Sequence, residues 1–262
     1  MNIVVLLGSP RKKDSYHVAQ LIEKKMGHEG DIRFDYIQLS DMTIHECKGC
    51  GLCFSKGEMY CPLKDDIQGI VKRMIQADGI LLASPVYACQ ITGTLKKAID
   101  RMAYLCHRPA MVGKPFINIV TTAGGGKKPT GQYMKMMGIA FGCHYVGTLP
   151  VISTMFFDDD KNSLYNEKYH QKILKKMDRL IKHFQKALHD TTPPRPSYYD
   201  IFLFNGLKSK TYMSEADHDY WKKKGWLKAN YYYPTQLSIG KKIFGYTINQ
   251  MIKMVWKRMQ QA

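Results

Sequence analysis

Short apolar runs alternate with amphipathic stretches along the first 190 residues of the chain. Runs rich in Ile, Val and Leu, or with apolar residues at every second position, predict five strands, at 2–7, 31–39, 79–84, 115–121 and 145–151. Apolar positions three and four residues apart predict helices at 15–26, 65–76, 94–105, 130–141 and 167–188. Strands that alternate with helices form a parallel sheet covered on both faces, so the pattern predicts a doubly wound α/β fold.

Five strands favour the flavodoxin-like strand order, in which ligands bind at the carboxyl ends of the strands. Three loops at that edge have a composition suited to a flat ligand that carries a phosphate. The loop 8–15 places hydroxyls, a guanidinium and free amides at a helix start, as phosphate sites do. The loop 84–96 contains SPVY and TGTLK, and glycines in 121–126 let the backbone approach a ring closely. Each loop alone also fits an ordinary strand–helix turn, and neither G-x-G-x-x-G nor a Walker motif is present.

The strongest candidates for chemistry are four cysteines within fifteen residues, Cys47, Cys50, Cys53 and Cys61. They follow the spacing C-x2-C-x2-C-x7-C, and Gly49 and Gly51 allow the backbone to curl so that three thiolates converge on one centre. A fourth thiolate closes the cage, which is the ligand set of a [4Fe-4S] cluster. Two alternatives stay open at this point. The cysteines are also compatible with reduced thiols that bind no metal, or with a zinc site, although zinc more often uses two separated C-x2-C pairs.

Net charge and cysteine content indicate the class of ligand and the compartment, but they identify no partner. The formal net charge of +17 predicts attraction to anionic surfaces or ligands. No nucleic-acid recognition motif accompanies this charge, so we expect no nucleic-acid binding. Seven cysteines without an export signal predict a reducing, cytoplasmic compartment. No run of 18 apolar residues occurs, so the sequence predicts no plain membrane span.

A proline cluster at 191–196 predicts a domain boundary, because it cannot continue a helix. We expect a flavodoxin-like domain at 1–190, with the cysteine loop inserted at 45–62, and a C-terminal extension at 191–262. The extension is rich in Tyr, Trp and Phe and carries 12 Lys and Arg against 4 Asp and Glu from residue 193 onward. Its last part, 235–259, reads as a basic amphipathic helix. A lid over the ligand, an oligomer contact and a contact with an anionic membrane are the alternatives for the extension.

The combination of GSPR, ASPVY, TGTLKKAIDR and TTAGGG resembles the NAD(P)H-dependent FMN reductase family of flavodoxin-like flavoproteins, over about residues 1–185. The cysteine run before the third strand is similar to that of the iron–sulfur flavoproteins within this family. The resemblance implies FMN as a cofactor and NAD(P)H as the electron donor. It implies that Ser9, Arg11 and Ser15 hold the FMN phosphate. It also implies that Pro85, Val86 and Tyr87 lie along the isoalloxazine ring, and that Thr122, Gly124 and Gly125 contact its polar edge.

We therefore expect an FMN-dependent oxidoreductase that accepts electrons from NAD(P)H and reduces a quinone, a nitroaromatic, a flavin or a similar acceptor, with the cluster as a further electron carrier. No side chain is predicted as a general acid or base, because the flavin itself supplies the chemistry. The alternative is a non-enzymatic flavin and iron–sulfur electron-transfer protein docked to a membrane or to a redox partner. By family analogy we expect a homodimer or a homotetramer.

Overall fold

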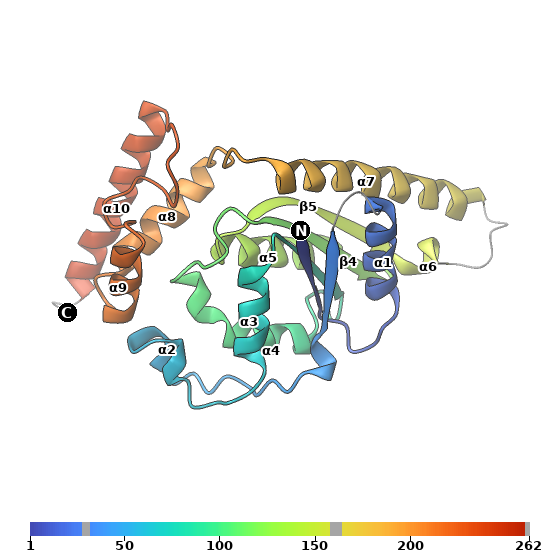
Figure 1. Cartoon of the computed structure of the whole chain (residues 1–262), viewed down its shortest axis with the longest axis horizontal. Coiled ribbons are helices and arrows are strands. Elements are labelled where there is room, and N and C mark those ends of the chain that lie inside the picture. The colour runs from blue at the N-terminus through green and yellow to red at the C-terminus, as the bar shows by residue number, and fades with distance from the viewer. Residues whose placement is uncertain (28–31, 158–163, 260–262) are drawn as a thin grey trace.

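The structure, a computed structural model, describes residues 1–27, 32–157 and 164–259 of the chain. Its centre is a sheet of five parallel strands in the order β2-β1-β3-β4-β5, which confirms the predicted flavodoxin-like fold (Figure 1). The strands are β1 (Asn2–Leu7), β2 (Arg33–Gln38), β3 (Gly79–Pro85), β4 (Pro115–Thr122) and β5 (His144–Ile152). The predicted strand at 31–39 begins outside the described residues, and its described part forms β2.

The two faces of the sheet bury different side chains because successive residues of a strand point to opposite faces. On one face, α1 (Asp14–Met26) and α7 (Leu164–His189) cover the odd-numbered apolar residues of β1, together with the short α6 (Ser153–Phe156). On the other face lie α3 (Ile67–Gln76), α4 (Gly93–Arg101) and α5 (Lys127–Ala140). Helices on both faces make the buried, doubly wound arrangement that the alternation of strands and helices predicts.

Most predicted elements differ from the observed ones only at their ends. The helix predicted at 94–105 is divided into α4 and a 3-10 turn, η3 (Ala103–Cys106). Three short elements were not predicted from the sequence: η1 (Leu39–Asp41), which precedes the cysteine loop, and α2 (Leu52–Ser55) and η2 (Glu58–Tyr60) within it. These turns are too short for apolar periodicity to reveal.

The region at 197–234, for which no helix was predicted, contains α8 (Tyr198–Lys210) and α9 (Glu215–Lys223). Ser197 and Asp200 form a capping box at the start of α8, in which each side chain accepts a hydrogen bond from the other residue's backbone amide. The final helix, α10 (Ile239–Met259), packs against α8, and the predicted helix at 235–259 corresponds to it. In Figure 1, α8, α9 and α10 form a group at one end of the sheet, with α9 beside α2.

An aromatic cluster holds this extension together. Phe204 and Trp221 are fully buried, their ring centroids lie 5.3 Å apart, and Trp226 completes the cluster. The extension also contacts the rest of the protein through hydrogen bonds, since the Tyr220 hydroxyl donates to the carbonyl of Pro109 at 2.8 Å. Among the described residues, no helix has the length and apolar content needed to cross a bilayer.

Candidate flavin and cysteine site

The first loop at the carboxyl edge follows β1 and is fixed by its neighbours. Gly8 lies so close to α4 that a Cβ added there would be 2.7 Å from Cβ of Leu95. The hydroxyl of Thr92 donates to the carbonyl of Gly8 at 2.5 Å and also caps α4. The side-chain amide of Gln38 donates to the carbonyl of Ser9. Neighbouring strands and α4 therefore determine the path of this loop, as a preformed binding site requires.

Positive charge is concentrated at the start of α1, directly after this loop. The Ser9 hydroxyl donates to the carbonyl of Arg11 at 2.7 Å and accepts from its amide at 3.2 Å. Lys12 pairs with Asp41 at 3.4 Å, whereas the guanidinium of Arg11 pairs with no residue that the structure describes. An exposed cation at a helix N-terminus suits a phosphate group. The hydroxyl of Ser15 lies deeper, 2.7 Å from that of Thr121, and joins α1 to β4.

The second loop, after β3, makes a tight reverse turn. The amide of Tyr87 donates to the carbonyl of Gln90 at 2.8 Å, and the amide of Gln90 donates back at 2.9 Å. The two residues between them, Ala88 and Cys89, have φ of 47° and 62°. Non-glycine residues in this left-handed region cost roughly 1–3 kcal/mol each and persist where the surroundings impose them. The turn leaves the Tyr87 side chain 43% exposed at the edge of the sheet.

The third loop, after β4, packs against the second. Gly126 has φ of +78°, and a Cβ there would be 2.5 Å from Cγ1 of Val86. The hydroxyl of Thr122 donates to the carbonyl of Gly125 at 2.7 Å and accepts from the amide of Gly124 at 3.0 Å. The amide of Gly124, expected at the flavin's polar edge, is thus already used within the loop. Ala123, Gly124 and Gly125 stay exposed.

The structure thus brings the nine predicted flavin residues to the ends of β1, β3 and β4, which are neighbours in the sheet. This edge includes the switch point of the fold, because β2 lies on one side of β1 and β3 on the other. An unpaired guanidinium at one end, and a wall made by Val86 and the glycine loop at the other, fit a flat cofactor with a phosphate. The individual contacts of these nine residues with a flavin stay predictions.

The four predicted cysteines line a single cavity of about 240 Å³ between the cysteine loop and α4. Gly49 and Gly51, with φ of +64° and +70°, provide the curled backbone that the spacing predicts. All four thiols are free. Within the described ranges, no three His, Cys, Asp or Glu side chains converge closely enough to hold a single metal ion. Four thiols around a cavity of this volume fit a larger centre, such as an iron–sulfur cluster, better than one zinc ion with bonds of about 2.3 Å.

Burial and neighbouring charges change the pKa of Cys53, one of the thiols that line the cavity. Burial raises the pKa of Cys53, and the neighbouring thiol of Cys47 raises it further, while the guanidinium of Arg108 opposes both. Nη2 of Arg101 lies 3.5 Å from Sγ of Cys61. Arg101 is itself buried in an ion pair with Asp65. At Cys53, burial and the neighbouring thiols outweigh Arg108, so the pKa of this thiol lies above its ordinary value.

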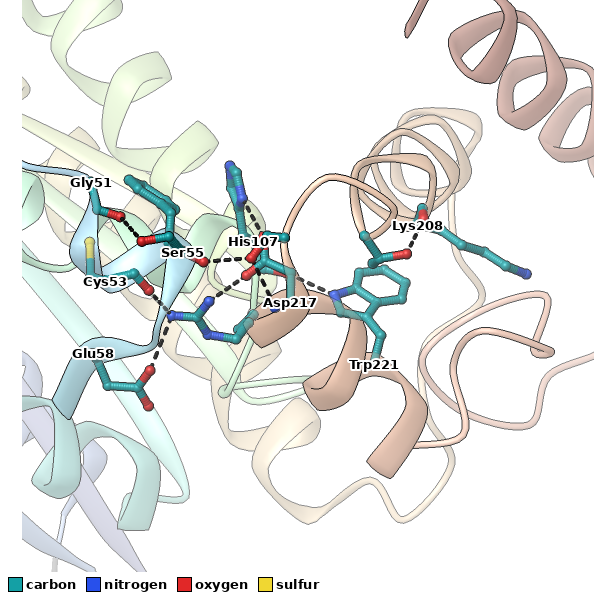
Figure 2. A network of polar contacts seen from close by, with 12 residues as sticks. Gly51, Cys53, Ser55, Glu58, His107, Lys208, Asp217 and Trp221 are labelled. Carbon is teal, nitrogen blue, oxygen red and sulfur yellow. Dashed lines mark hydrogen bonds and ion pairs between the residues drawn. The ribbon is translucent and has the colours of Figure 1, made fainter. Parts of the chain in front are cut away.

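Sequence reasoning missed three charged residues that complete this site, namely Arg108, Glu58 and Asp217. The guanidinium of Arg108 donates to the backbone carbonyl of Cys53, to the carboxylate of Glu58 and to the carboxylate of Asp217 in α9. Figure 2 shows these three partners facing one another. Arg108 and Asp217 are only 4% and 2% exposed. The one local signal was a charged residue within an otherwise apolar stretch, residues 102–112, and its partner lies 109 positions away.

A separate cavity of about 500 Å³ lies between α5 and the extension, lined among others by Lys135, Tyr145 and Tyr231. It is at the amino ends of β4 and β5, because Gly113 and His144 also line it. It is therefore distinct from the flavin loops, which lie at the carboxyl ends of the strands.

Comparisons with known proteins agree with this geometry. A family model described as NADPH-dependent FMN reductase matches residues 1–158. An iron-sulfur flavoprotein of Archaeoglobus fulgidus is 31% identical over 236 residues, which cover 87% of this chain and 100% of that protein. An iron-sulfur flavoprotein of Methanocaldococcus jannaschii is 33% identical over 136 residues, which cover 50% of this chain and 66% of that protein.

Solved structures show the same fold at lower identity. An NADH:FMN oxidoreductase in its apo form has a TM-score of 0.52 and 19% identity, and the match covers 73% of this chain and 91% of that one. RosB, solved with a bound formylriboflavin phosphate intermediate, has a TM-score of 0.52 and 10% identity, and the match covers 91% of this chain and 92% of that one. At these identities the likeness concerns the fold alone.

The buried pair of Arg101 and Asp65 provides a test of how this site is held. Burial alone would raise the pKa of Asp65, but hydrogen bonds from the amide of His45 and from Arg101 outweigh burial and hold the pKa below its usual value. Asp65→Asn leaves a buried guanidinium without its counter-ion, so we expect a loss of about 3–5 kcal/mol in the free energy of unfolding at neutral pH.

A lowered pKa in the folded state gives stability above the unfolded pKa of about 3.9, and this stability is lost as the pH falls further. Urea denaturation of the wild type and of Asp65→Asn, at pH 7 and near pH 3, should therefore show a difference that shrinks in acid. Asp100→Asn is the control, because its exposed pair with Lys96 is worth about 1 kcal/mol at most. Equal losses for the two variants would contradict this account.

Proposed function

Because the chain belongs to the NADPH-dependent FMN reductase family and is an NAD(P)H-dependent oxidoreductase, we propose that it uses FMN together with a [4Fe-4S] cluster to reduce a quinone, a nitroaromatic, a flavin or a similar small acceptor. The observation that supports this proposal is that α4 runs from the flavin loops to the cysteine cavity. At its start, Thr92 bonds the flavin loop at Gly8, and at its end Arg101 lies 3.5 Å from the sulfur of Cys61. A helix of 9 residues spans about 13 Å, so one rigid element separates the two sites.

In the flavin site, the protein's task is to bind and orient. FMN, when bound, supplies the transfer of hydride and electrons. The Arg11 guanidinium and the Ser9 hydroxyl would bind the phosphate, with Ser15 beneath them. Pro85, Val86 and Tyr87 would line one face of the ring and exclude water from it, and Thr122, Gly124 and Gly125 would border its polar edge. No general acid or base is assigned, because orientation and electrostatics suffice for this chemistry.

In the cysteine site, Cys47, Cys50, Cys53 and Cys61 would be the four ligands of the cluster. The cluster, when bound, supplies single-electron transfer. Arg101 would donate a charge-assisted hydrogen bond to the sulfur of Cys61, which favours added negative charge there. Asp65 would keep that guanidinium oriented toward the cavity.

A second candidate function is that of an electron-transfer protein docked to a membrane or a redox partner, without turnover of its own. It is favoured by apolar side chains that α10 leaves exposed: Ile239, Ile243, Tyr246 and Met254 are between 56% and 77% accessible. Lys242 lies on the same side of the helix. A second copy in a homodimer or homotetramer would also cover such a face, but the basic character of the helix favours an anionic surface.

The decisive experiment is anaerobic purification of the full chain with its visible spectrum and an assay of iron and sulfide. We expect flavin absorbance with about four iron and four sulfide per chain, and steady-state oxidation of NAD(P)H with quinone as acceptor. Cys50→Ser should lose the iron and keep the flavin, whereas Cys89→Ser, with an exposed thiol outside the cysteine run, should keep both. Flavin without iron would remove the cluster from the proposal, and cofactors without turnover would favour the electron-transfer protein.

Arg11→Gln tests the phosphate site. A hydrogen bond to a charged group contributes about 1.5–3 kcal/mol, so FMN affinity should fall by roughly ten- to a hundredfold when flavin binding is titrated by fluorescence. Lys12→Gln is the matched control, because Lys12 already pairs with Asp41 and should change the affinity little. Equal effects of the two variants would indicate only general electrostatic attraction.

Vesicle sedimentation tests the surface of α10. We expect binding to vesicles that contain phosphatidylserine and little binding to phosphatidylcholine alone, with loss of binding in Ile243→Asp. Met136→Asp, which changes an exposed apolar side chain on α5, should bind as the wild type does. Vesicle binding that does not depend on lipid charge, or that Ile243→Asp leaves unchanged, would argue against membrane contact through α10.

A further inference from the structure

Arg108 lies where the cysteine loop meets the C-terminal extension. It is 4% exposed, and its guanidinium donates to the backbone carbonyl of Cys53, to the carboxylate of Glu58 at 3.1 Å and to the carboxylate of Asp217 (Figure 2). Cys53 and Glu58 belong to the cysteine loop, whereas Asp217 belongs to α9. One buried cation thus joins two segments that are far apart in the sequence.

Further hydrogen bonds hold α9 in the same place. Asp217 also lies 2.8 Å from Nδ1 of His107, and the indole of Trp221 donates to the carbonyl of His107 at 2.8 Å. The Ser214 hydroxyl, which caps α9, donates to the carbonyl of Phe54 at 2.5 Å. Phe54 is the neighbour of Cys53 in the short helix α2. The start of α9 therefore contacts the cysteine loop both directly and through Arg108.

Of the two carboxylates that pair with Arg108, Asp217 is the more important because it is the more deeply buried. Glu58 is 37% exposed at its side chain, whereas Asp217 is only 2% exposed. A buried guanidinium needs a desolvated counter-ion, and its planar fork can serve a carbonyl and two carboxylates at once, which a lysine ammonium cannot reproduce in the same geometry. Without Asp217, Arg108 would be drawn toward solvent, and the carbonyl of Cys53 would lose its donor.

We propose that the C-terminal extension is a latch for the cysteine loop, in which Asp217 is a positioning residue that acts through Arg108 to hold Cys53 toward the cavity shared by the four cysteines. The latch rests on the proposed function only in calling that cavity a cluster site. In the described part of the chain, none of the hydrogen bonds made by α9 reaches the flavin loops. Loss of the latch therefore loosens the cysteine loop and leaves flavin binding in place.

The test uses the full chain, purified in air, freed of iron by a chelator and loaded with FMN. Alkylation of each cysteine by iodoacetamide is followed by peptide mass spectrometry. In Asp217→Asn and in Arg108→Lys, Cys53 should react about tenfold faster than in the wild type, because local opening of the loop is easier. Cys89, which is exposed in the flavin loop, should react at an unchanged rate and serves as the internal standard. Asp219→Asn, a change to an exposed carboxylate of the same helix, should behave as the wild type.

Asp217→Glu should restore part of the protection, since it keeps the charge. The double variant Arg108→Met with Asp217→Leu removes both charges, so it should fold even where a single variant does not, and its Cys53 should still react quickly. Anaerobically purified Asp217→Asn should hold less iron than the wild type at equal FMN content.

Wild-type alkylation rates at Cys53 in both single variants and in the double variant would overturn the latch. A rise at Cys53 and Cys89 together, with loss of FMN, would also overturn it, because the pair would then support the whole fold. Because the thiol measurement uses metal-free protein, a wild type that never binds iron would refute the proposed cluster and still leave the latch testable.

Discussion

The cysteine loop is folded around two buried arginines, and the geometry of the site depends on them. Arg101 binds the two ends of the loop: it donates to the carbonyl of His45 at 3.2 Å and to the carbonyl of Leu63 at 3.3 Å, and pairs with Asp65. Arg108 holds the middle of the loop through Cys53 and Glu58. A loop with so little regular structure cannot satisfy its carbonyls internally, so cations from the neighbouring segment do this. The same two cations set the charge around the four thiols.

The segment that carries these arginines also fixes the distance between the two sites. Thr92, which caps the start of α4, is bonded to the loop after β1, and Arg101 at the end of α4 lies beside the sulfur of Cys61. Its apolar face is buried against the sheet through Leu95, Ala98 and Ile99. Because a helix is stiff over so short a length, the flavin loops and the cysteine cavity keep a constant separation. The function proposed above requires such a fixed separation between a flavin and a cluster.

The C-terminal extension also supports the cysteine loop. Its aromatic cluster around Trp221 gives α8 and α9 a core of their own, and hydrogen bonds to His107 and Pro109 join that core to the turn that carries Arg108. The support of the cysteine loop therefore comes from residues more than 100 positions later in the chain. α10, which packs against α8, leaves several apolar side chains exposed.

The sheet could be predicted from the sequence, and so could the edge at which the three candidate flavin loops meet. Buried parallel strands require uninterrupted apolar runs such as residues 3–7, and the strand order brings GSPR, ASPVY and TTAGGG to one edge. The curled backbone between the cysteines could also be predicted, because Gly49 and Gly51 lie between them, and the four cysteines line one cavity. The helix α8 could not, because its aromatic and apolar residues lie on several sides and conceal its periodicity. The helix α9 has only nine residues, most of them polar, so it shows no clear apolar repeat.

The pair of Arg108 and Asp217 depended on tertiary structure alone. Sequence patterns report the preferences of neighbouring residues, whereas a buried ion pair forms only where folding brings two distant side chains together and removes water from both. The sequence by itself determined a flavodoxin-like sheet, its flavin edge and a loop of four cysteines. The tertiary structure decided what holds that loop, because desolvation of a charge is a property of the whole packed molecule.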